Sequence, residues 1–267
     1  MTSLNNLMSL KGRRAIVTGA NGNLGKVIVT TLAELGAGVV LVDLPGNDMQ
    51  VFANNVSEEW SIETQCISCD LESESDRENL ITSLKQSGSG FDILVNNAAF
   101  VGTADLSGWA DQFENQSLET WRRAIEVNLT AAFHLSQALT PELKKSDGGS
   151  IINIASIYGQ YGPDWSLYKG TKMANPAAYG VSKGGLIQLT RWLATTIAPD
   201  VRVNSISPGG IYRDQPEEFV SKYSDRTPLG RMAVEDDFKG AIAFLSSDMS
   251  SYMTGQILQV DGGWGEW

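Results

Sequence analysis

The sequence predicts an α/β fold, a doubly wound parallel sheet with helices on both faces. First, short apolar runs alternate with longer amphipathic segments along the chain, as in parallel strands connected by helices. Second, strand-like runs such as VVLV at 39–42 are apolar on both sides, which is typical of strands buried between two helical layers. The 267 residues, 42% of them hydrophobic, suffice for one substantial core. We therefore expect residues 1–267 to form a single domain.

The expected strands and helices follow one another in chain order. Seven runs are predicted to be strands: 14–19, 39–43, 63–70, 91–96, 150–156, 201–207 and 256–263. Helical segments are expected at 24–36, 74–88, 118–139, 179–198 and 235–247, and a polar helix-like stretch lies between the strands at 39–43 and 63–70. Two stretches interrupt the alternation, an insertion at 158–177 and a loop at 209–234. Both are longer than ordinary connections, so we expect them to contact the substrate.

Composition narrows the class of ligand and the location of the protein. A formal net charge of −11 opposes binding to nucleic acid or to an anionic membrane surface. No run approaches the ~20 apolar residues of a membrane span, and the first residues lack the apolar stretch of a signal peptide. These observations favour a cytoplasmic protein with a small-molecule ligand.

The cysteines and the one histidine do not predict a metal site. Cys66 and Cys69 lie in a predicted strand, where their odd spacing places the two thiols on opposite faces, and no second cysteine pair completes a zinc site. His134 lies on a helical pattern, where a structural or interface role is the expectation. A histidine-based triad is therefore not expected.

A glycine-rich turn connects the first strand to the first helix. VTGANGNLGKV places Gly19, Gly22 and Gly25 at this junction. Glycines here allow backbone N–H groups and the positive helix end to approach a pyrophosphate without interference from Cβ atoms. A flexible turn is the alternative interpretation.

Two acidic residues follow the next two strands. Asp43 ends the second strand, where a dinucleotide fold presents a carboxylate to the adenosine ribose hydroxyls. Such a carboxylate repels a 2′-phosphate, and no cation follows it directly, so we expect NAD as cofactor. A strand-ending Asp before a turn is the alternative. Asp70 is expected either to face the adenine or to cap the following helix.

Together these motifs resemble the short-chain dehydrogenase/reductase family, over nearly the whole chain and in its shorter, single-domain branch. The resemblance rests on VTGANGNLG, Asp43, Asp70, Asn96-Asn97-Ala98-Ala99, Asn128, Ser156, a Tyr-x-x-x-Lys pair, Pro208-Gly209 and TGQILQVDGG. It implies a Rossmann fold and a homodimer or homotetramer. The complete set of residues expected to contact the cofactor is Gly19, Asn21, Gly22, Asn23, Leu24, Gly25, Asp43, Asp70, Leu71, Asn97, Ala98, Ala99, Tyr179, Lys183, Pro208, Gly209 and Ile211.

The Tyr-x-x-x-Lys pattern occurs twice, as Tyr168/Lys172 and as Tyr179/Lys183. The second pair opens a clear helical repeat, so its side chains lie one turn apart on the same face. The first pair lies in YKGTKMANP, where glycine and proline disfavour a helix. We therefore predict that Tyr179 and Lys183 are the catalytic pair and leave the role of Tyr168 and Lys172 open.

The residue types of the pair fit alcohol oxidation. A base must take the hydroxyl proton, and an ordinary tyrosine with a pKa near ~10 is protonated at neutral pH. One cation at ~4 Å with an effective dielectric of ~20 supplies roughly the 4 kcal/mol that lowers this pKa by about 3 units. The family resemblance implies that Lys183 also holds the nicotinamide ribose. It further implies that Ser156 orients the substrate oxygen and that Asn128 supports a proton-relaying water.

Two positions depart from the family pattern. Gly22 lies one place earlier than in the shorter branch, with Asn23 at the usual glycine position, and Ala99 replaces the usual glycine after Asn-Asn-Ala. Asparagine tolerates a left-handed backbone better than most residues, so we expect the turn to survive. These departures concern the geometry of the cofactor contacts.

Aromatic residues and lysines in the insertion, among them Lys169 and Lys172, favour a sugar or sugar phosphate as substrate. They predict a lid over 163–176 whose cations bind an anionic group. The insertion also resembles oxidoreductases of bacterial nonulosonic acid and flagellin-glycan biosynthesis. Two alternatives stay open, a non-catalytic dinucleotide-binding sensor and an epimerase or dehydratase of nucleotide sugars. The intact catalytic set argues against the first, and the short segment after Pro208 argues against the second.

Overall fold

The computed structural model describes residues 2–86, 88, 90–101, 106–171 and 173–267. Its seven-stranded sheet has the order β3-β2-β1-β4-β5-β6-β7, and all neighbouring strands are parallel. The predicted doubly wound fold is thus confirmed. The strands are β1 (Arg14–Thr18), β2 (Gly38–Asp43), β3 (Thr64–Ser68), β4 (Ile93–Asn96), β5 (Gly149–Ile154), β6 (Val201–Pro208) and β7 (Ile257–Val260).

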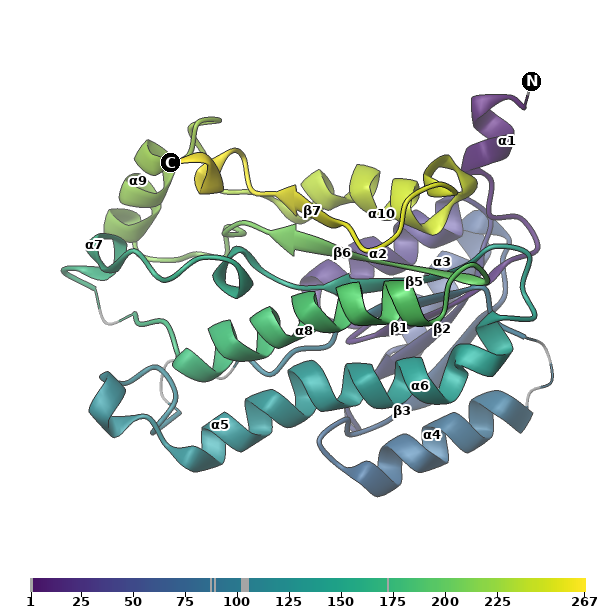
Figure 1. Ribbon diagram of the computed structural model, residues 1–267, viewed down its shortest axis with the longest axis horizontal. Helices are drawn as coiled ribbons and strands as arrows, with labels where there is room; N and C mark the ends of the chain where they lie inside the picture. The colour runs from purple at the N-terminus through teal and green to yellow at the C-terminus, as the bar shows by residue number, and fades with distance from the viewer. Residues whose placement is uncertain (1, 87, 89, 102–105, 172) are drawn as a thin grey trace.

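Helices cover both faces of the sheet. Figure 1 shows α4, α5, α6 and α8 in front of the sheet and α2 and α3 behind it, where α10 packs beside α2. None of the helices that the structure describes is long and apolar enough to cross a membrane. The helices are α1 (Leu4–Met8), α2 (Asn23–Glu34), α3 (Gln50–Trp60), α4 (Glu74–Gln86), α5 (Leu118–Ile125), α6 (Ala131–Leu143), α7 (Trp165–Tyr168), α8 (Ala177–Thr196), α9 (Glu217–Arg226) and α10 (Lys239–Ser246).

The strands supply side chains to two hydrophobic layers. In β1, Ala15 and Val17 are buried against one helical layer, whereas Ile16 is buried against the other. Successive side chains of a strand point to opposite faces, so a run that is apolar throughout fills both layers. Burial of a valine or isoleucine side chain, such as Val17 or Ile16, contributes about 1.5–3 kcal/mol. The continuous apolar runs of the sequence therefore explain why the sheet lies between two helical layers.

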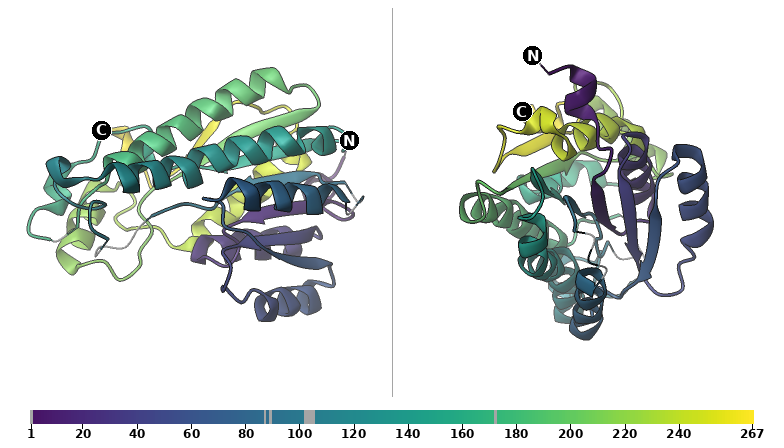
Figure 2. Two further views of the ribbon diagram at one scale, coloured as in Figure 1. Left: turned by 90° about the horizontal axis from the view of Figure 1, so that it is seen from below. Right: turned by 90° about the vertical axis from the view of Figure 1, so that its right-hand side faces the viewer.

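The two predicted loops contain helices and pack against each other. The insertion 158–177 includes α7, and the segment 209–234 includes α9, which contacts α7. Tyr168, Phe219, Tyr223 and Trp264 form an aromatic cluster between them. Figure 1 shows α7, α9 and the C-terminus together at the end of the molecule toward which β6 points, and Figure 2 shows α1 at the opposite end.

A buried arginine on α4 contacts α6 and the turn before it, in the same helical layer. Arg77 is 2% exposed, donates to the carbonyl oxygen of Leu71 at 2.5 Å and pairs with Glu126 at 2.6 Å. Its Nε donates to Nδ1 of His134 at 3.3 Å, which gives the histidine the structural role expected for it. Because Leu71 follows β3, this arginine holds the turn after β3 in place.

The two cysteines lie on opposite faces, as expected. Cys69 is buried in the layer formed with α4, α6 and α8, whereas Cys66 packs against the layer on the other side of the sheet. Both are free thiols. Among the residues that the structure describes, no group of three or more His, Cys, Asp or Glu side chains is arranged to hold a metal ion.

Candidate active site

A cavity of about 710 Å³ lies at the carboxyl ends of the strands. The order of the strands reverses between β1 and β4, and in open α/β sheets ligands bind in the crevice at such a reversal. Every residue predicted above to contact the cofactor lines this cavity, from Gly19 to Ile211. Ser156 lines it too. The structure thus brings the predicted residues together, and their individual roles stay predictions.

The glycine turn depends on two close approaches of backbone to backbone. Gly19 has a φ of +63°, and a Cβ there would lie 2.8 Å from Cα of Ala98. A Cβ on Gly25 would lie 2.0 Å from the carbonyl oxygen of Gly19, so no side chain fits. At Gly22 a Cβ would meet only that oxygen, at 3.4 Å. Two of the three glycines are therefore required by the fold itself.

The expected left-handed conformation at Asn23 is not present. Asn23 is the first residue of α2, Gly22 caps this helix, and the positive φ belongs to Gly19 instead. The tolerance of asparagine for a left-handed backbone is thus not needed. The first N–H groups of a helix have no partner within it, so the start of α2 offers donors and a positive dipole end to the cavity. Together with the glycine turn before it, this helix start fits a dinucleotide pyrophosphate.

Asp43 fixes this turn through hydrogen bonds to both of its oxygens. One oxygen accepts the N–H of Asn21 at 2.7 Å, and the other accepts from Leu44 N and from Asn47 Nδ2, each at 2.8 Å. Asp70 also lines the cavity, and its side chain accepts the N–H of Glu72 at 2.9 Å. Asp70 does not cap the following helix, because α4 begins at Glu74 and Oγ of Ser73 accepts the N–H of Asp76 at 3.3 Å. Its position on the cavity wall is compatible with the other interpretation, in which it faces the adenine.

The predicted catalytic pair and Ser156 meet at one point of the cavity. Tyr179 and Lys183 lie one turn apart at the start of α8, and Ser156 follows β5. The lysine ammonium lies 5.8 Å from the centroid of the tyrosine ring and donates to the carbonyl oxygen of Ile154 at 2.7 Å. The side chain of Ser156 lies next to that of Tyr179, and its Oγ accepts the N–H of Tyr158 at 3.2 Å. A hydroxyl pair of this kind can hold the oxygen of an alcohol or a ketone.

The expected net lowering of the Tyr179 pKa is not seen in this structure. Burial raises the pKa of Tyr179, and the neighbouring hydroxyl of Ser156 and the charge of Arg213 offset this only in part. Lys183 is only 2% exposed, and burial lowers its pKa to about 8. A tyrosine that stays protonated at neutral pH can donate its proton to the developing oxyanion of a ketone under reduction.

Asn128 does not line the cavity. It lies in a π-helical turn, Glu126–Thr130, between α5 and α6, and is 1% exposed. Its Oδ1 accepts the N–H of Phe100 at 2.6 Å, and its Nδ2 donates to Oγ of Ser182 at 3.0 Å. Asn128 therefore connects the segment after β4 to the catalytic helix, and the water relay expected from the family stays a prediction.

Tyr168 lies outside the cavity that holds Tyr179. It is 8% exposed, shares a hydrogen bond of 2.7 Å with the hydroxyl of Tyr158 and accepts from Nδ2 of Asn175 at 3.3 Å. It lines a second cavity of about 710 Å³, which adjoins the first at Tyr158. Its partner in the pattern, Lys172, lies outside the described residues. The geometry of Tyr168 is that of a structural residue in the aromatic cluster.

Sequence reasoning missed several residues of the cavity. They come from segments whose approach depends on tertiary packing: Phe100, Val101, Arg123, Arg213 and Gln215. Tyr158, in contrast, belongs to the insertion that was expected to contact the substrate. The region of Arg213 was indicated by the length of the interruption at 209–234, but no local pattern singles out this arginine. Lys169, expected to face the substrate, is exposed and lines neither cavity.

Comparison with known proteins agrees with this geometry. A family model described as enoyl-(acyl carrier protein) reductase matches residues 19–265. The chain is 30% identical to the 3-oxoacyl-(acyl-carrier-protein) reductase of Aquifex aeolicus, over 96% of this chain and 98% of that protein. The chain belongs to the short-chain dehydrogenase/reductase family. It is thus an oxidoreductase of a family of alcohol and ketone dehydrogenases and reductases that use a nicotinamide dinucleotide.

Solved structures of this family are closely similar. A candidate NAD(P)-dependent gluconate 5-dehydrogenase from Beutenbergia cavernae, with bound NADP, has a TM-score of 0.86 and 31% identity and covers 98% of this chain and 100% of that one. An NAD+-bound xylitol dehydrogenase has a TM-score of 0.83 and 29% identity and covers 95% of this chain and 99% of its own. Both dinucleotides therefore occur among similar proteins.

The glycine turn yields a matched pair of variants. Gly25→Ala should lower the free energy of unfolding by about 2–4 kcal/mol, because its methyl group overlaps the carbonyl oxygen of Gly19. Gly22→Ala should cost less than about 1 kcal/mol, since alanine is only a poorer helix cap there. Urea unfolding of both variants measures the difference. Equal losses of stability would contradict the close approach at Gly25.

The buried lysine predicts a pH-dependent stability. Burial lowers the pKa of Lys183 from 10.5 to about 8, so the unfolded chain binds more protons than the folded chain between these values. The charged lysine therefore destabilises the fold below pH ~8, and this penalty fades as the pH rises toward ~10. Lys183→Met should gain stability relative to the unmutated chain at pH 7, by at most about 3 kcal/mol, and should keep only about half of this gain or less at pH ~9.5.

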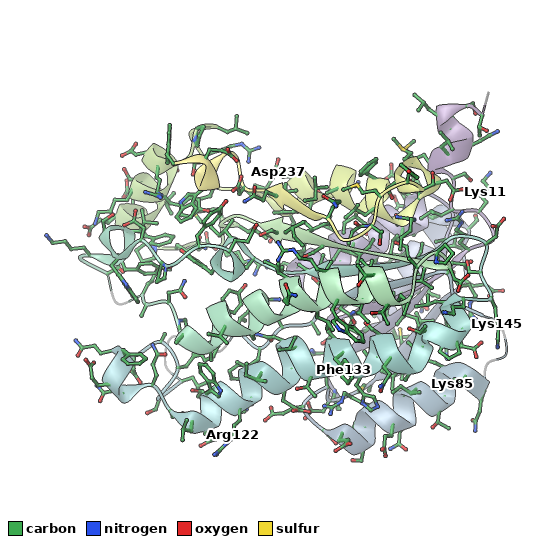
Figure 3. All side chains as sticks on the ribbon, in the orientation of Figure 1. Lys11, Lys85, Arg122, Phe133, Lys145 and Asp237 are labelled. Carbon is green, nitrogen blue, oxygen red and sulfur yellow. The ribbon has the colours of Figure 1, made fainter. Side chains whose placement is uncertain are left out.

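Urea unfolding at the two pH values, with turnover measured in parallel, checks this prediction. Lys85→Met is the control, because Lys85 is exposed on α4 (Figure 3) and its ammonium stays in water in both states. A stability difference for Lys183→Met that stays constant across the pH range would show that the lysine keeps its ordinary pKa.

Proposed function

We propose that the protein is an NAD(H)-dependent oxidoreductase that interconverts a secondary alcohol and a ketone, on a sugar or a sugar-derived substrate. One observation carries the proposal. Ser156, Tyr179 and Lys183 line the same cavity as the glycine turn and Asp43. A proton donor or acceptor thus lies in the same cavity as the residues proposed to bind the dinucleotide, as hydride transfer requires.

Each residue has a physical role in this reaction. The bound dinucleotide supplies or accepts the hydride at the carbon of the substrate. The start of α2 and the glycine turn would hold its pyrophosphate, and Lys183 would bind the ribose next to the nicotinamide. Ser156 positions the substrate oxygen, and Tyr179 gives it a proton during reduction or removes one during oxidation. The ammonium of Lys183 favours the ionised form of the tyrosine during oxidation.

The preference for NAD over NADP rests on Asp43. Its carboxylate lines the cavity, and the four residues after it, Leu44 to Asn47, include no cation that could pair with a 2′-phosphate. A 2′-phosphate near this carboxylate would meet like charge. The NAD+-bound xylitol dehydrogenase shows that the fold accommodates NAD+.

A polyol or sugar substrate is supported by the composition of the cavity. Tyr158, Gln215 and Arg213 add polar groups close to the catalytic end. Two of the similar structures are described as acting on xylitol and on gluconate. The likeness of the insertion to nonulosonic acid and flagellin-glycan enzymes stays a hypothesis about the pathway.

We also propose a homo-oligomer, because apolar side chains are exposed on the packed helices α5, α6 and α8. They include Trp121, Phe133 and Trp192. Exposed apolar surface of this kind marks an interaction site. A cytoplasmic location and a single domain over residues 1–267 stay predictions from the sequence.

The proposed mechanism predicts opposite phenotypes for the two tyrosines. Tyr179→Phe should lower kcat at least about 100-fold while NAD affinity stays within about twofold, because only the proton-transferring hydroxyl is lost. Tyr168→Phe should keep most of its activity and lose stability by about 1 kcal/mol, since it removes the hydrogen bond with Tyr158. NADH absorbance with a panel of polyols, sugar acids and sugar phosphates measures turnover. Exchanged phenotypes would refute the assignment of Tyr179.

Cofactor preference yields a second prediction for this function. The unmutated protein should bind NADH more tightly than NADPH, and Asp43→Asn should narrow this ratio about tenfold, the factor that 1.4 kcal/mol makes. Fluorescence titration with both nucleotides measures the affinities. Because Asp43 also fixes the glycine turn, urea unfolding of the variant serves as the control. Equal affinities in the unmutated protein would be incompatible with the proposed role of Asp43.

A further inference from the structure

Charge is distributed unevenly around the active-site cavity. Among the described residues, the carboxylates that line it are Asp43, at the end of β2, and Asp70 and Glu72, which follow β3. The lining residues from 154 to 215 include two cations, Lys183 and Arg213, and no carboxylate. In a chain with a formal net charge of −11, this end of the cavity is the place where an anion is favoured.

The guanidinium of Arg213 is only partly used by the protein. Its Nε pairs with Oε1 of Glu235 at 3.1 Å, and the side chain is 45% exposed. Within the described part of the chain, no hydrogen bond to a protein acceptor is recorded for its two terminal nitrogens. An arginine has five N–H donors in a planar fork, so the end away from Glu235 can still bind a carboxylate or phosphate with two parallel bonds.

The backbone around Arg213 is fixed in advance. Its N–H donates to Oε1 of Gln215 at 2.7 Å, and Nε2 of the same glutamine donates to the carbonyl oxygen of Ile211 at 2.8 Å. Asp214 has a φ of 55°, a left-handed conformation that non-glycine residues rarely adopt. A residue held in this way has little freedom to lose when it binds a ligand.

Arg213 is also close enough to act on the reacting groups. Its positive charge lowers the pKa of Tyr179 against the larger effect of burial. The other arginine of the cavity differs, because Arg123 donates from Nε to both oxygens of Glu72, at 3.1 and 3.0 Å, and stacks on Phe100. Arg213 is therefore the better candidate to bind the substrate.

We propose that Arg213 is a specificity-determining residue that binds an anionic group of the substrate, a carboxylate or a phosphate, close to the carbon that is oxidised or reduced. The inference rests on the proposed function and narrows it to anionic polyols such as sugar acids and sugar phosphates. It also replaces Lys169 as an anion-binding residue, since Lys169 does not line the cavity.

The test compares anionic probes with neutral counterparts. D-gluconate and D-glucitol 6-phosphate are the anionic probes, and D-glucitol is the neutral one. Steady-state kinetics with NAD+ gives kcat and KM, and thermal stabilisation of the NADH-bound protein gives binding without turnover. The variants are Arg213→Gln, Arg213→Lys and the control Arg231→Gln. Arg231 pairs with Asp237, which is labelled near the upper edge of Figure 3, and does not line the cavity.

The unmutated protein should bind at least one anionic probe more tightly than D-glucitol. Arg213→Gln should raise KM for that probe, or weaken its binding, about 10- to 100-fold, the range of a charge-assisted contact. The same variant should change KM and binding for D-glucitol less than twofold, and its affinity for NADH should not change. Arg213→Lys should recover part of the loss, and Arg231→Gln should behave like the unmutated protein. Carboxylate and phosphate probes show which anion is preferred.

Three results would overturn the inference. The first is equal binding of the anionic and neutral probes, or no binding of the anionic ones, in the unmutated protein. The second is an Arg213→Gln variant with unchanged discrimination. The third is a loss of NADH affinity in this variant as large as the loss for the probe, which would assign Arg213 to the cofactor. Turnover of D-glucitol alone would leave the proposed oxidoreductase intact, whereas anion binding without turnover of any alcohol would contradict the proposed function alone.

Discussion

The contact between Gly25 and the carbonyl oxygen of Gly19 is the constraint on which the site depends. No Cβ fits between them, so the first turn of α2 lies directly against the end of β1. This approach places the free N–H groups of the helix at the crevice between β1 and β4. Asp43 then closes the turn from the neighbouring strand through its bond to Asn21. The cofactor end of the cavity is thus built largely from backbone, which explains why small residues dominate it.

The catalytic end is built on the opposite principle, since it buries polar side chains. Lys183 is buried and donates to the carbonyl oxygen of Ile154, and the partly buried Tyr179 lies one helical turn away. Burial disfavours the charged form of each group, so both pKa values move toward the neutral forms. The unfavourable free energy of burying these ionisable groups therefore falls at the position where proton transfer is proposed. Asn128 and Ser182 reinforce the same helix with a hydrogen bond of 3.0 Å.

Substrate selection belongs to segments that the sheet does not determine. The insertion and the segment with α9 meet in the aromatic cluster, and Tyr158 extends from that cluster to the wall of the catalytic cavity. Arg213 lies on the same segment as α9, held by Gln215. Packing among aromatic rings thereby connects the residues that face the substrate to the rest of the fold.

The sequence by itself determined the order of strands and helices, the glycine turn and the grouping of Tyr179 with Lys183. These features depend on local patterns, namely two-sided apolar runs, glycines at a junction and a spacing of four on one helix. Tertiary structure decided that Asn128 lies behind the cavity, that Tyr168 is a buried member of the aromatic cluster and that Arg213, not Lys169, faces the site. Such positions depend on which segments distant in sequence pack together, and no local spacing encodes that. The left-handed residue likewise proved to be Gly19, because the contact with Ala98 sets the backbone there.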